Sequence, residues 1–585
     1  MLRTNKMAYL LAISVIMTML SWSQEITINT QLGQITGMSR TNVVGNTTVY
    51  DFRKIPFAKA PIGDLRFEKP QPHGSWNDTL VARTYGPSCF QNLSSSVYEA
   101  LQNKNVSEDC LYLNIHVPFD VSSNNNKAVM VWIHGGGYST GQAAIYDGAY
   151  LAATGDVIVV TISYRLNIFG FFAMGDIKGN YGLWDQIMAI QWVKDNIGSF
   201  GGNNQSITIF GESAGGFSAG LLSIIPTNRG LFHRAILQSG TAISTYTTST
   251  ITKSFSTKAA SSLSCSQTET SFLLKCLKDL NADDLLGQAS RTELKRLFAI
   301  PFAPVIDGEL LTDDPNNVLM NVESAGYIFY RSLDVVIGTV SGDSSSLLNI
   351  FTSTLQNVFK FNSSDYIPGR IVCDVIAPDI ALVDYKNNTQ ISNAICEKYG
   401  KVTNKTEQSL SVLDSYSDFV FNIPMIKSLR AHAENQNENG KHYQYLFSKP
   451  SPFIFSGPYP AWFTRAEHAS EIAFEFPFTV LEPGDFTLAM QFMKFWTHFA
   501  KTGNMNAAEL PQWNEYDTTN EHYINFDVPI TTGQHLFKDR SKFWLSDIPD
   551  ILQGDTSTAS RVQTEQIIRM SVYCIIVCIS FILLV

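Results

Sequence analysis

Short segments that consist almost wholly of apolar residues recur at intervals along the chain. They lie at residues 129–133, 157–162, 207–210, 235–237 and 335–337. Between two of them, residues 187–197 space their apolar positions three and four apart, as an amphipathic helix does. Apolar segments without alternating polarity are typical of parallel strands that helices cover on both sides. The pattern therefore predicts an α/β fold with a large central, mostly parallel sheet and helices on both faces.

Two glycine-containing motifs directly follow these segments, at the strand ends where parallel sheets bind their ligands. Residues 207–210 run into G-E-S-A-G at 211–215, and residues 129–133 run into H-G-G-G-Y at 134–138. A G-x-S-x-G motif between a strand and a helix is the context of a nucleophile elbow, whose glycines keep side chains clear of a strained serine. A glycine string leaves backbone N–H groups free to hold a developing oxyanion. We therefore expect Ser213 to be a nucleophile.

The two termini have the composition of processing signals. Arg3 and Lys6 precede an apolar stretch at residues 7–20, and small residues flank Trp22. This order predicts a secretory signal peptide at residues 1–23, with a buried first helix as the alternative.

The C-terminus ends in an apolar run at residues 571–585, behind small residues and a polar spacer. This order predicts a GPI-attachment signal at residues 554–585. A short transmembrane anchor and a buried last helix are the alternatives, although a span needs roughly 17–25 residues. Residues 24–553 are then expected to form one domain. We place it at the extracellular face of the plasma membrane, held there by the anchor, or among secreted proteins.

The net charge indicates which partners the chain can have, and its cysteines indicate the compartment in which it folds. The formal net charge of −10 argues against a nucleic-acid partner. Six of the eight cysteines lie outside the apolar tail, as expected in an oxidising compartment, and six cysteines allow 15 pairings. No C-x-x-C or H-E-x-x-H motif occurs, so we expect no metal site and no cofactor.

Eight N-x-S/T sequons predict a glycosylated surface. Their asparagines are Asn46, Asn77, Asn92, Asn105, Asn204, Asn362, Asn387 and Asn404.

Several further motifs make the chain resemble the type-B carboxylesterase and cholinesterase family, from about Ile26 to about Ile551. They are F-R-K-I-P-F-A at 52–58, S-E-D-C-L-Y-L-N at 107–114, Y-R-L-N-I-F-G-F at 164–171, G-L-W-D-Q at 182–186 and F-A-K-T-G-N at 499–504. The resemblance implies the α/β-hydrolase fold and a serine hydrolase that cleaves carboxylic esters.

The resemblance also implies cross-links and ion pairs within the domain. It implies the disulfides Cys89–Cys110 and Cys265–Cys276, which leave Cys373 and Cys396 as a third pair. Ion pairs are expected between Arg66 and Glu108 and between Arg165 and Asp185.

In this fold an acid and then a histidine follow the serine along the chain. Residues 338–344 match the family's acid segment, with Asp343 in place of the usual glutamate; a surface acid is the alternative. His468 has the family's H-x-x-E pattern. The resemblance thus implies that His468 takes the proton of Ser213 and that Asp343 holds the imidazole.

The same resemblance implies an oxyanion hole and a second carboxylate. The backbone N–H groups of Gly136, Gly137 and Ala214 are expected to hold the oxyanion, and Glu212 to stabilise the cationic imidazole or to anchor the elbow.

The expected substrate is a small carboxylic ester, neutral or lipid-like. Cholinesterases carry a tryptophan in their first disulfide loop that holds quaternary ammonium, and no tryptophan lies between Cys89 and Cys110. A choline-ester hydrolase, or a cell-surface adhesion protein on the same fold, is the alternative.

Overall fold

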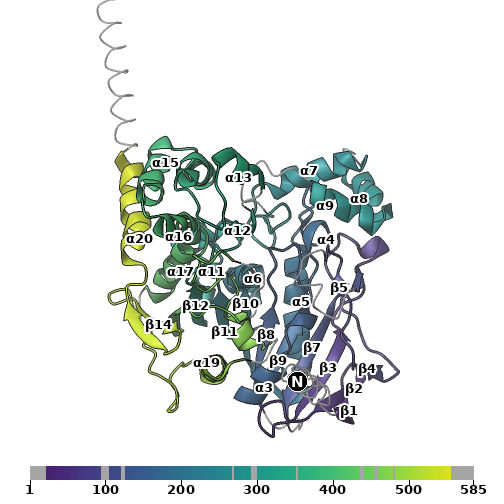
Figure 1. Cartoon of the computed structure of the whole chain (residues 1–585). Coiled ribbons are helices and arrows are strands. Elements are labelled where there is room, and N and C mark those ends of the chain that lie inside the picture. The colour runs from purple at the N-terminus through teal and green to yellow at the C-terminus, as the bar shows by residue number, and fades with distance from the viewer. Residues whose placement is uncertain are drawn as a thin grey trace, which may run out of the picture. The chain divides into compact units, whose positions relative to one another are not determined.

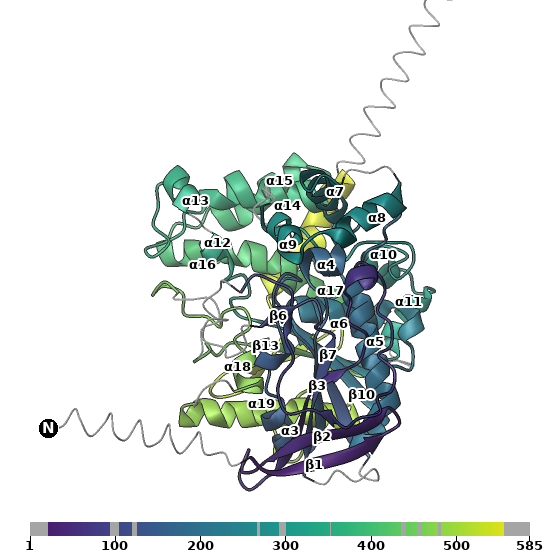
Figure 2. The same cartoon turned by 90° about the vertical axis from the view of Figure 1, so that its right-hand side faces the viewer.

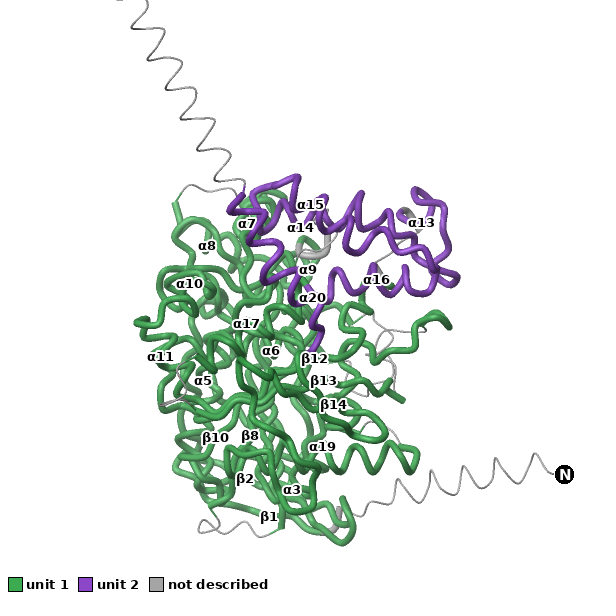
Figure 3. The backbone as a smooth tube through the Cα atoms, turned by 90° about the vertical axis from the view of Figure 1, so that its left-hand side faces the viewer, with its two compact units in different colours: residues 1–352, 419–535 green, residues 353–418, 536–585 purple. Residues whose placement is uncertain are grey.

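The computed structural model describes residues 22–93, 105–119, 126–265, 269–291, 300–350, 353–434, 440–452, 459–477 and 481–554. The chain groups into two compact units (Figure 3). Residues 1–352 and 419–535 form the first unit, and residues 353–418 and 536–585 form the second. The predicted domain, residues 24–553, therefore draws on both units, and its boundaries stay a prediction.

A mixed sheet of 13 strands organises the first unit (Figure 1). Twelve of its strands follow the order β1-β2-β3-β7-β9-β8-β10-β11-β12-β13-β14-β15, and β4 pairs with β2. The bounds are β1 Trp22–Thr30, β2 Gly33–Arg40, β3 Val49–Pro56, β4 Leu80–Val81, β7 Tyr112–Pro118, β8 Lys127–Ile133, β9 Ile158–Ile162, β10 Gly202–Glu212, β11 Arg234–Gln238, β12 Asp334–Val340, β13 His442–Phe447, β14 His522–Phe526 and β15 Thr531–Gln534.

The centre of the sheet is parallel, from β9 through β8, β10, β11, β12 and β13 to β14. The five predicted apolar segments coincide with β8, β9, β10, β11 and β12, and their apolar side chains are buried. The predicted α/β fold with a mostly parallel central sheet is therefore confirmed. Antiparallel strands extend it at both edges, and β5 (Ser88–Cys89) pairs separately with β6 (Val106–Ser107).

Helices cover both faces of the sheet (Figures 1 and 2). The helices α5 (Tyr181–Asn196) and α6 (Ala214–Ile224) pack against β10, whereas α3 (Ala149–Gly155) and α19 (Pro483–Thr502) pack against each other and the opposite face. Residues 187–197, predicted to be helical, fall largely within α5. The aromatic side chains of Trp132, Phe210, Phe476 and Trp496 belong to the core between α19 and the sheet.

The other helices of the first unit surround this framework. They are α4 Asn167–Phe171, α7 Thr252–Ser262, α8 Thr270–Asp279, α9 Ala282–Arg291, α10 Pro315–Met320, α11 Ala325–Arg331, α12 Leu347–Ile350, α17 Ile423–Ala433 and α18 Ile472–Glu475.

The second unit is helical in its described part. It contains α13 Ser353–Phe359, α14 Ala377–Asp384, α15 Thr389–Ile395, α16 Lys405–Ser417 and α20 Lys538–Lys542, with π-helical turns such as η5 Val372–Ile376 and η6 Cys396–Gly400. The buried Tyr399 hydroxyl donates to Asp418 at 2.7 Å and accepts from Trp544 at 2.8 Å. The contact with Trp544 connects the two chain segments that make up the unit.

Two disulfides and two ion pairs lie where the family resemblance placed them, and a third disulfide joins the two remaining cysteines of the domain. The structure joins Cys89 to Cys110, Cys265 to Cys276 and Cys373 to Cys396. The bidentate pairs Arg66–Glu108, at 2.6 Å, and Arg165–Asp185, at 2.8 Å, are both present.

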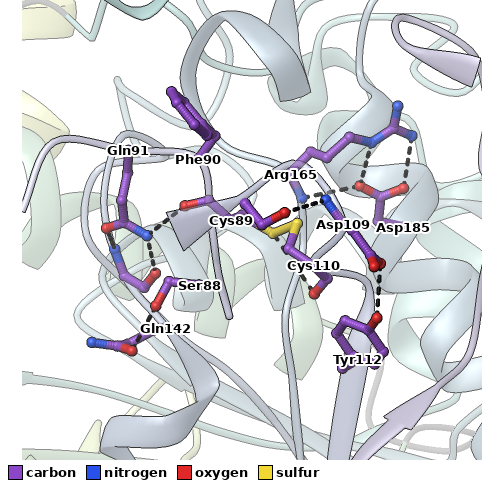
Figure 4. The surroundings of a disulfide bond; sticks show 12 residues. Ser88, Cys89, Phe90, Gln91, Asp109, Cys110, Tyr112, Gln142, Arg165 and Asp185 are labelled. Atoms are coloured by element: carbon purple, nitrogen blue, oxygen red, sulfur yellow. Dashed lines mark hydrogen bonds and ion pairs between the residues drawn. A yellow bond between two sulfur atoms is a disulfide. The ribbon is translucent and has the colours of Figure 1, made fainter. Parts of the chain in front are cut away.

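The first disulfide is tied to the chain that follows β8 (Figure 4). Gln91, two residues beyond Cys89, exchanges two hydrogen bonds with the backbone of Gly141, at 2.7 and 2.8 Å. Ser88 donates to Gln142 at 2.6 Å. The disulfide segment therefore holds the far side of the loop that begins with the H-G-G-G-Y motif.

The predicted processing segments lie almost wholly outside the described residues, which begin with β1 at Trp22 and end at Gly554. Within the described ranges, no helix has the length and apolar character needed to cross a membrane. All eight sequon asparagines are exposed, so each is open to modification.

Candidate active site

The G-E-S-A-G motif forms a tight turn between β10 and α6. Ser213 lies at its apex with φ 57° and ψ −122°, a conformation that non-glycine residues adopt only under strain. A Cβ atom on Gly211 or Gly215 would lie 2.5 or 2.0 Å from the Ile133 carbonyl oxygen. The turn thus requires glycine on both sides of the serine, because it passes so close to the end of β8.

The glycine string after β8 lies against this turn. A Cβ atom on Gly135 would come within 3.1 Å of the Ser213 Cβ atom. Gly136 and Gly137 adopt φ values of 107° and 60°. Within the described part of the chain, the amides of Gly136, Gly137 and Ala214 donate no hydrogen bond. Three unused donors therefore lie on segments that meet at the serine.

Two loops bring Asp343 and His468 together. The Gly342 amide donates to the Ala466 carbonyl at 2.8 Å, and the His468 amide donates to Ser345 Oγ at 2.9 Å. Between these links, His468 Nδ1 and Asp343 Oδ1 are 2.6 Å apart. The acid and the histidine named from the sequence thus form a hydrogen-bonded pair.

Asp343 is held firmly despite having a shorter side chain than glutamate. The residue is completely buried. Its second oxygen, Oδ2, accepts hydrogen bonds from Ser239 Oγ at 2.8 Å, from the Val340 amide at 3.2 Å and from Thr339 Oγ1. These donors fix the carboxylate and leave Oδ1 for the imidazole. Asp343 is therefore not a surface acid, the alternative considered from the sequence.

The other ring nitrogen of His468 meets Glu212 rather than Ser213. Nε2 lies 3.1 Å from Glu212 Oε1, and within the described residues that oxygen accepts no hydrogen bond, so the contact is electrostatic. Among the described residues, the Ser213 hydroxyl has no hydrogen-bond partner either. The structure thus unites Asp343, His468 and Glu212 and leaves the Ser213–His468 hydrogen bond unformed. Catalytic hydrogen bonds commonly lengthen in free enzymes and tighten with substrate.

The surrounding carboxyl groups favour a charged imidazole. Burial lowers the pKa of His468, but the charge of Glu212 and the hydrogen bond and charge of Asp343 together raise it to about 9. Burial in turn raises the pKa of Glu212, partly offset by His468. The site therefore stabilises the imidazolium form of His468. A histidine that acts as a general base takes this form when it accepts a proton.

Replacing Glu212 by glutamine is expected to shift the pH profile of ester hydrolysis to lower pH. The base must be unprotonated, so kcat/KM rises as the pH rises through the pKa of His468. Glu212 raises that pKa, and its removal lowers it while Asp343 remains. Rates of p-nitrophenyl butyrate hydrolysis from about pH 5 to about pH 10 measure the shift. An unmoved rising limb would contradict it, and the exposed Glu509→Gln variant is the matched control.

Aromatic side chains form an apolar wall beside the imidazole. The ring of Phe421 lies 5.1 Å from that of His468, and Phe217, one turn beyond Ser213 on α6, stacks on Phe421 at 6.3 Å. Both phenylalanines are buried. They make this side of the imidazole apolar.

A groove of about 830 Å³ lies elsewhere in the first unit, along the outer face of α5. Trp184, Met188 and Trp192 line it together with the chain around Pro70 and Pro72. None of Ser213, Asp343 and His468 lines the groove, so the chemistry of these residues lies apart from it.

Comparison with known proteins agrees with this geometry. The profile of the carboxylesterase family matches residues 24–544, nearly the whole described chain. The chain belongs to this family. The family resemblance and the prediction of a carboxylic-ester hydrolase are therefore confirmed.

Individual carboxylesterases match over most of their length. Carboxylesterase 5A of Mus musculus is 34% identical over 567 residues, which cover 91% of each chain. Carboxylesterase 1D of Mus musculus is 34% identical over 541 residues, 88% of this chain and 92% of its own. Liver carboxylesterase B-1 of Rattus norvegicus is 32% identical over 541 residues, 88% and 93% of the two chains.

Proposed function

We propose that the chain hydrolyses carboxylic esters through an acyl-enzyme intermediate on Ser213, with His468 as general base and Asp343 as its supporting acid. The observation that carries this proposal is the 2.6 Å hydrogen bond between Asp343 and His468. The opposite side of the imidazole faces Glu212, the residue next to Ser213. The pairing of an acid with a base, beside the residue that precedes the nucleophile, supports a serine hydrolase.

The reaction proceeds in two matched halves. Ser213 Oγ attacks the ester carbonyl carbon while its proton passes to His468 Nε2, and the N–H groups of Gly136, Gly137 and Ala214 hold the oxyanion. His468 then returns the proton to the departing alcohol. Water attacks the acyl-enzyme with the same help from His468, and the carboxylic acid leaves with Ser213 restored.

Neutral esters with an apolar acyl group are the proposed substrates. Phe217 and Phe421 supply an apolar wall beside the imidazole, and such surface favours apolar groups. The first disulfide loop contains no tryptophan to hold quaternary ammonium. The similar proteins are named carboxylesterases, which favours neither a choline-ester hydrolase nor an adhesion protein.

Covalent labelling tests the nucleophile. A fluorophosphonate probe is expected to form a bond from phosphorus to Ser213 Oγ with loss of fluoride, because an activated serine attacks phosphorus as it attacks an ester. Peptide mapping by mass spectrometry identifies the labelled residue, and hydrolysis of p-nitrophenyl butyrate should fall in proportion to labelling. Full activity with Ser213 unlabelled, or label confined to another serine, would contradict the proposal.

We also propose the processing that the termini suggest. Residues 1–23 are removed as a signal peptide, the sequon asparagines carry glycans, and residues 554–585 direct attachment of a lipid anchor. The exposure of all eight asparagines supports glycosylation. A mature chain that begins before residue 24, lacks glycans or keeps residues 571–585, as measured by mass spectrometry, would contradict the corresponding step.

A further inference from the structure

Glu475 is a buried acid that the proposed mechanism does not use. It is the last residue of α18, and its exposed fraction is 0%. A buried carboxyl group destabilises a fold unless it is neutral or hydrogen-bonded. Glu475 lies in an otherwise aromatic core, beside Phe474 and Phe476, and its carboxyl group therefore needs a hydrogen-bond partner.

The partner is Gln238, whose amide nitrogen and amide oxygen both form hydrogen bonds. Gln238 Nε2 donates to Glu475 Oε2 at 3.2 Å, and Gln238 Oε1 accepts from Trp496 Nε1 at 3.3 Å. An indole nitrogen can only donate, so the amide oxygen must face Trp496 and the NH₂ group must face Glu475. The indole of Trp496 thus fixes the orientation of the amide.

Gln238 leads directly to the nucleophile. It ends β11, opposite Glu212 in the parallel ladder, and its carbonyl oxygen accepts the amide hydrogen of Ser213 at 2.9 Å. A Cβ atom on Gly216 would lie only 2.6 Å from the same oxygen, so the elbow follows this carbonyl closely. Any shift of Gln238 therefore moves the backbone of Ser213, which is already strained.

The surroundings of the Glu475 carboxyl group favour its neutral form. Burial raises its pKa well above the usual value, and the nearby Glu471 and Glu212 act in the same direction, while the hydrogen bond from Gln238 opposes them. Only Oε2 takes part in the contact with Gln238; within the described residues, Oε1 has no hydrogen-bond partner. A neutral amide, which also offers one oxygen, can thus replace the acid in this role.

We propose that Glu475 is a positioning residue for the nucleophile: its carboxyl group holds the side chain of Gln238, whose backbone carbonyl holds the amide of Ser213. The inference rests on the proposed function, because it assigns Ser213 as the nucleophile. Glu475 contacts neither the substrate nor the reacting atoms, and it acts through the placement of the elbow.

Two substitutions of Glu475 separate this role from simple burial. Glu475→Leu keeps the volume but leaves Gln238 Nε2 without an acceptor, and kcat is expected to fall about 10- to 100-fold, since small misplacements of reacting groups have effects of this size. KM should change less than about threefold, because no binding contact is lost. Glu475→Gln restores an acceptor and should keep kcat within about twofold of the wild type.

Rates are measured on full-length protein with p-nitrophenyl butyrate and divided by the concentration of sites that a fluorophosphonate titrates. Tyr330→Phe, which removes one buried hydrogen bond to the Ser428 carbonyl, controls for a general loss of stability. If Glu475→Leu does not fold, Trp496→Phe releases the other end of the same amide and should lower kcat at least threefold.

Three results would overturn the inference. One is an unchanged kcat per titrated site in Glu475→Leu, or in Trp496→Phe where the leucine variant does not fold. Another is Glu475→Gln as slow as Glu475→Leu, which would assign the effect to charge. The third is an equal loss in Tyr330→Phe. Failure of the proposed function is distinct, because the wild type would then hydrolyse no ester or would react with the probe at a residue other than Ser213.

Discussion

Replacing Ser213 by alanine is expected to lower kcat for ester hydrolysis about a million-fold while the protein stays folded. The substitution removes the atom that attacks the ester and leaves binding groups and oxyanion donors in place. The Ser213 hydroxyl makes no hydrogen bond within the described structure, and alanine has the same backbone restriction at φ 57°, so stability should change little.

Hydrolysis of p-nitrophenyl butyrate and thermal unfolding of purified proteins measure both effects. Ser254→Ala, on the exposed side of α7, is the matched control and should retain full activity. A Ser213→Ala variant with more than a few per cent of wild-type activity would mean that another group performs the attack.

Replacing Asp343 by asparagine is expected to lower kcat about ten-thousand-fold. The carboxylate accepts the Nδ1–H hydrogen bond of His468, which leaves Nε2 free to take a proton. An asparagine that kept its oxygen on the donors at Oδ2 would turn its NH₂ group towards Nδ1. The imidazole would then be held in the tautomer that cannot act as a base towards Ser213.

Asp343→Glu tests how closely the pocket fits the shorter acid. Ser239, Thr339 and the Val340 amide surround a completely buried side chain, so one more methylene crowds it, at a usual cost of about 1–3 kcal/mol. We expect a lower melting temperature but more activity than in Asp343→Asn, because a carboxylate remains. If Asp343→Asn stayed within tenfold of the wild type, another acid such as Glu471 would have to support the imidazole.

The central sheet could be predicted because its strands are buried on both sides. The segments in β8 to β12 consist almost wholly of apolar residues, a pattern that surface strands do not show. The edge strands lack that pattern. β13 was missed for another reason: His442 and Gln444 are polar but buried, and contacts such as His442 with His432 at 3.2 Å give the histidine a partner.

The candidate site was predictable where it depends on local chain geometry. Glycines around Ser213 and in the string at 135–137 are required by close backbone approaches, and such requirements leave a linear motif. Groups whose roles depend on side-chain contacts leave no such motif. Ser239, Thr339 and Glu475 are common residue types, and their roles depend on partners 4 to 237 positions away. Ser239 and Thr339 carried a usable sign, since each lies two residues beyond an apolar segment.

The resemblance implied that Glu212 stabilises the imidazole, but the motifs could not predict that Nε2 meets Glu212 in place of Ser213. The contact depends on whether the His468 imidazole turns Nε2 towards Glu212 Oε1 or towards Ser213 Oγ. Side-chain rotations of this kind follow from the packing of Phe421 and the loop around Glu467, not from motif spacing.

The backbone links between the loops of Asp343 and His468 make the two residues one cooperative unit. Segments joined in this way open together, with a common free energy. We therefore expect a fluctuation that withdraws His468 to withdraw its carboxylate as well, which leaves no long-lived form with an unsupported histidine. During gradual denaturation each molecule is then either fully competent or inert, so the fraction of active molecules falls while the rate constant of those that remain stays the same.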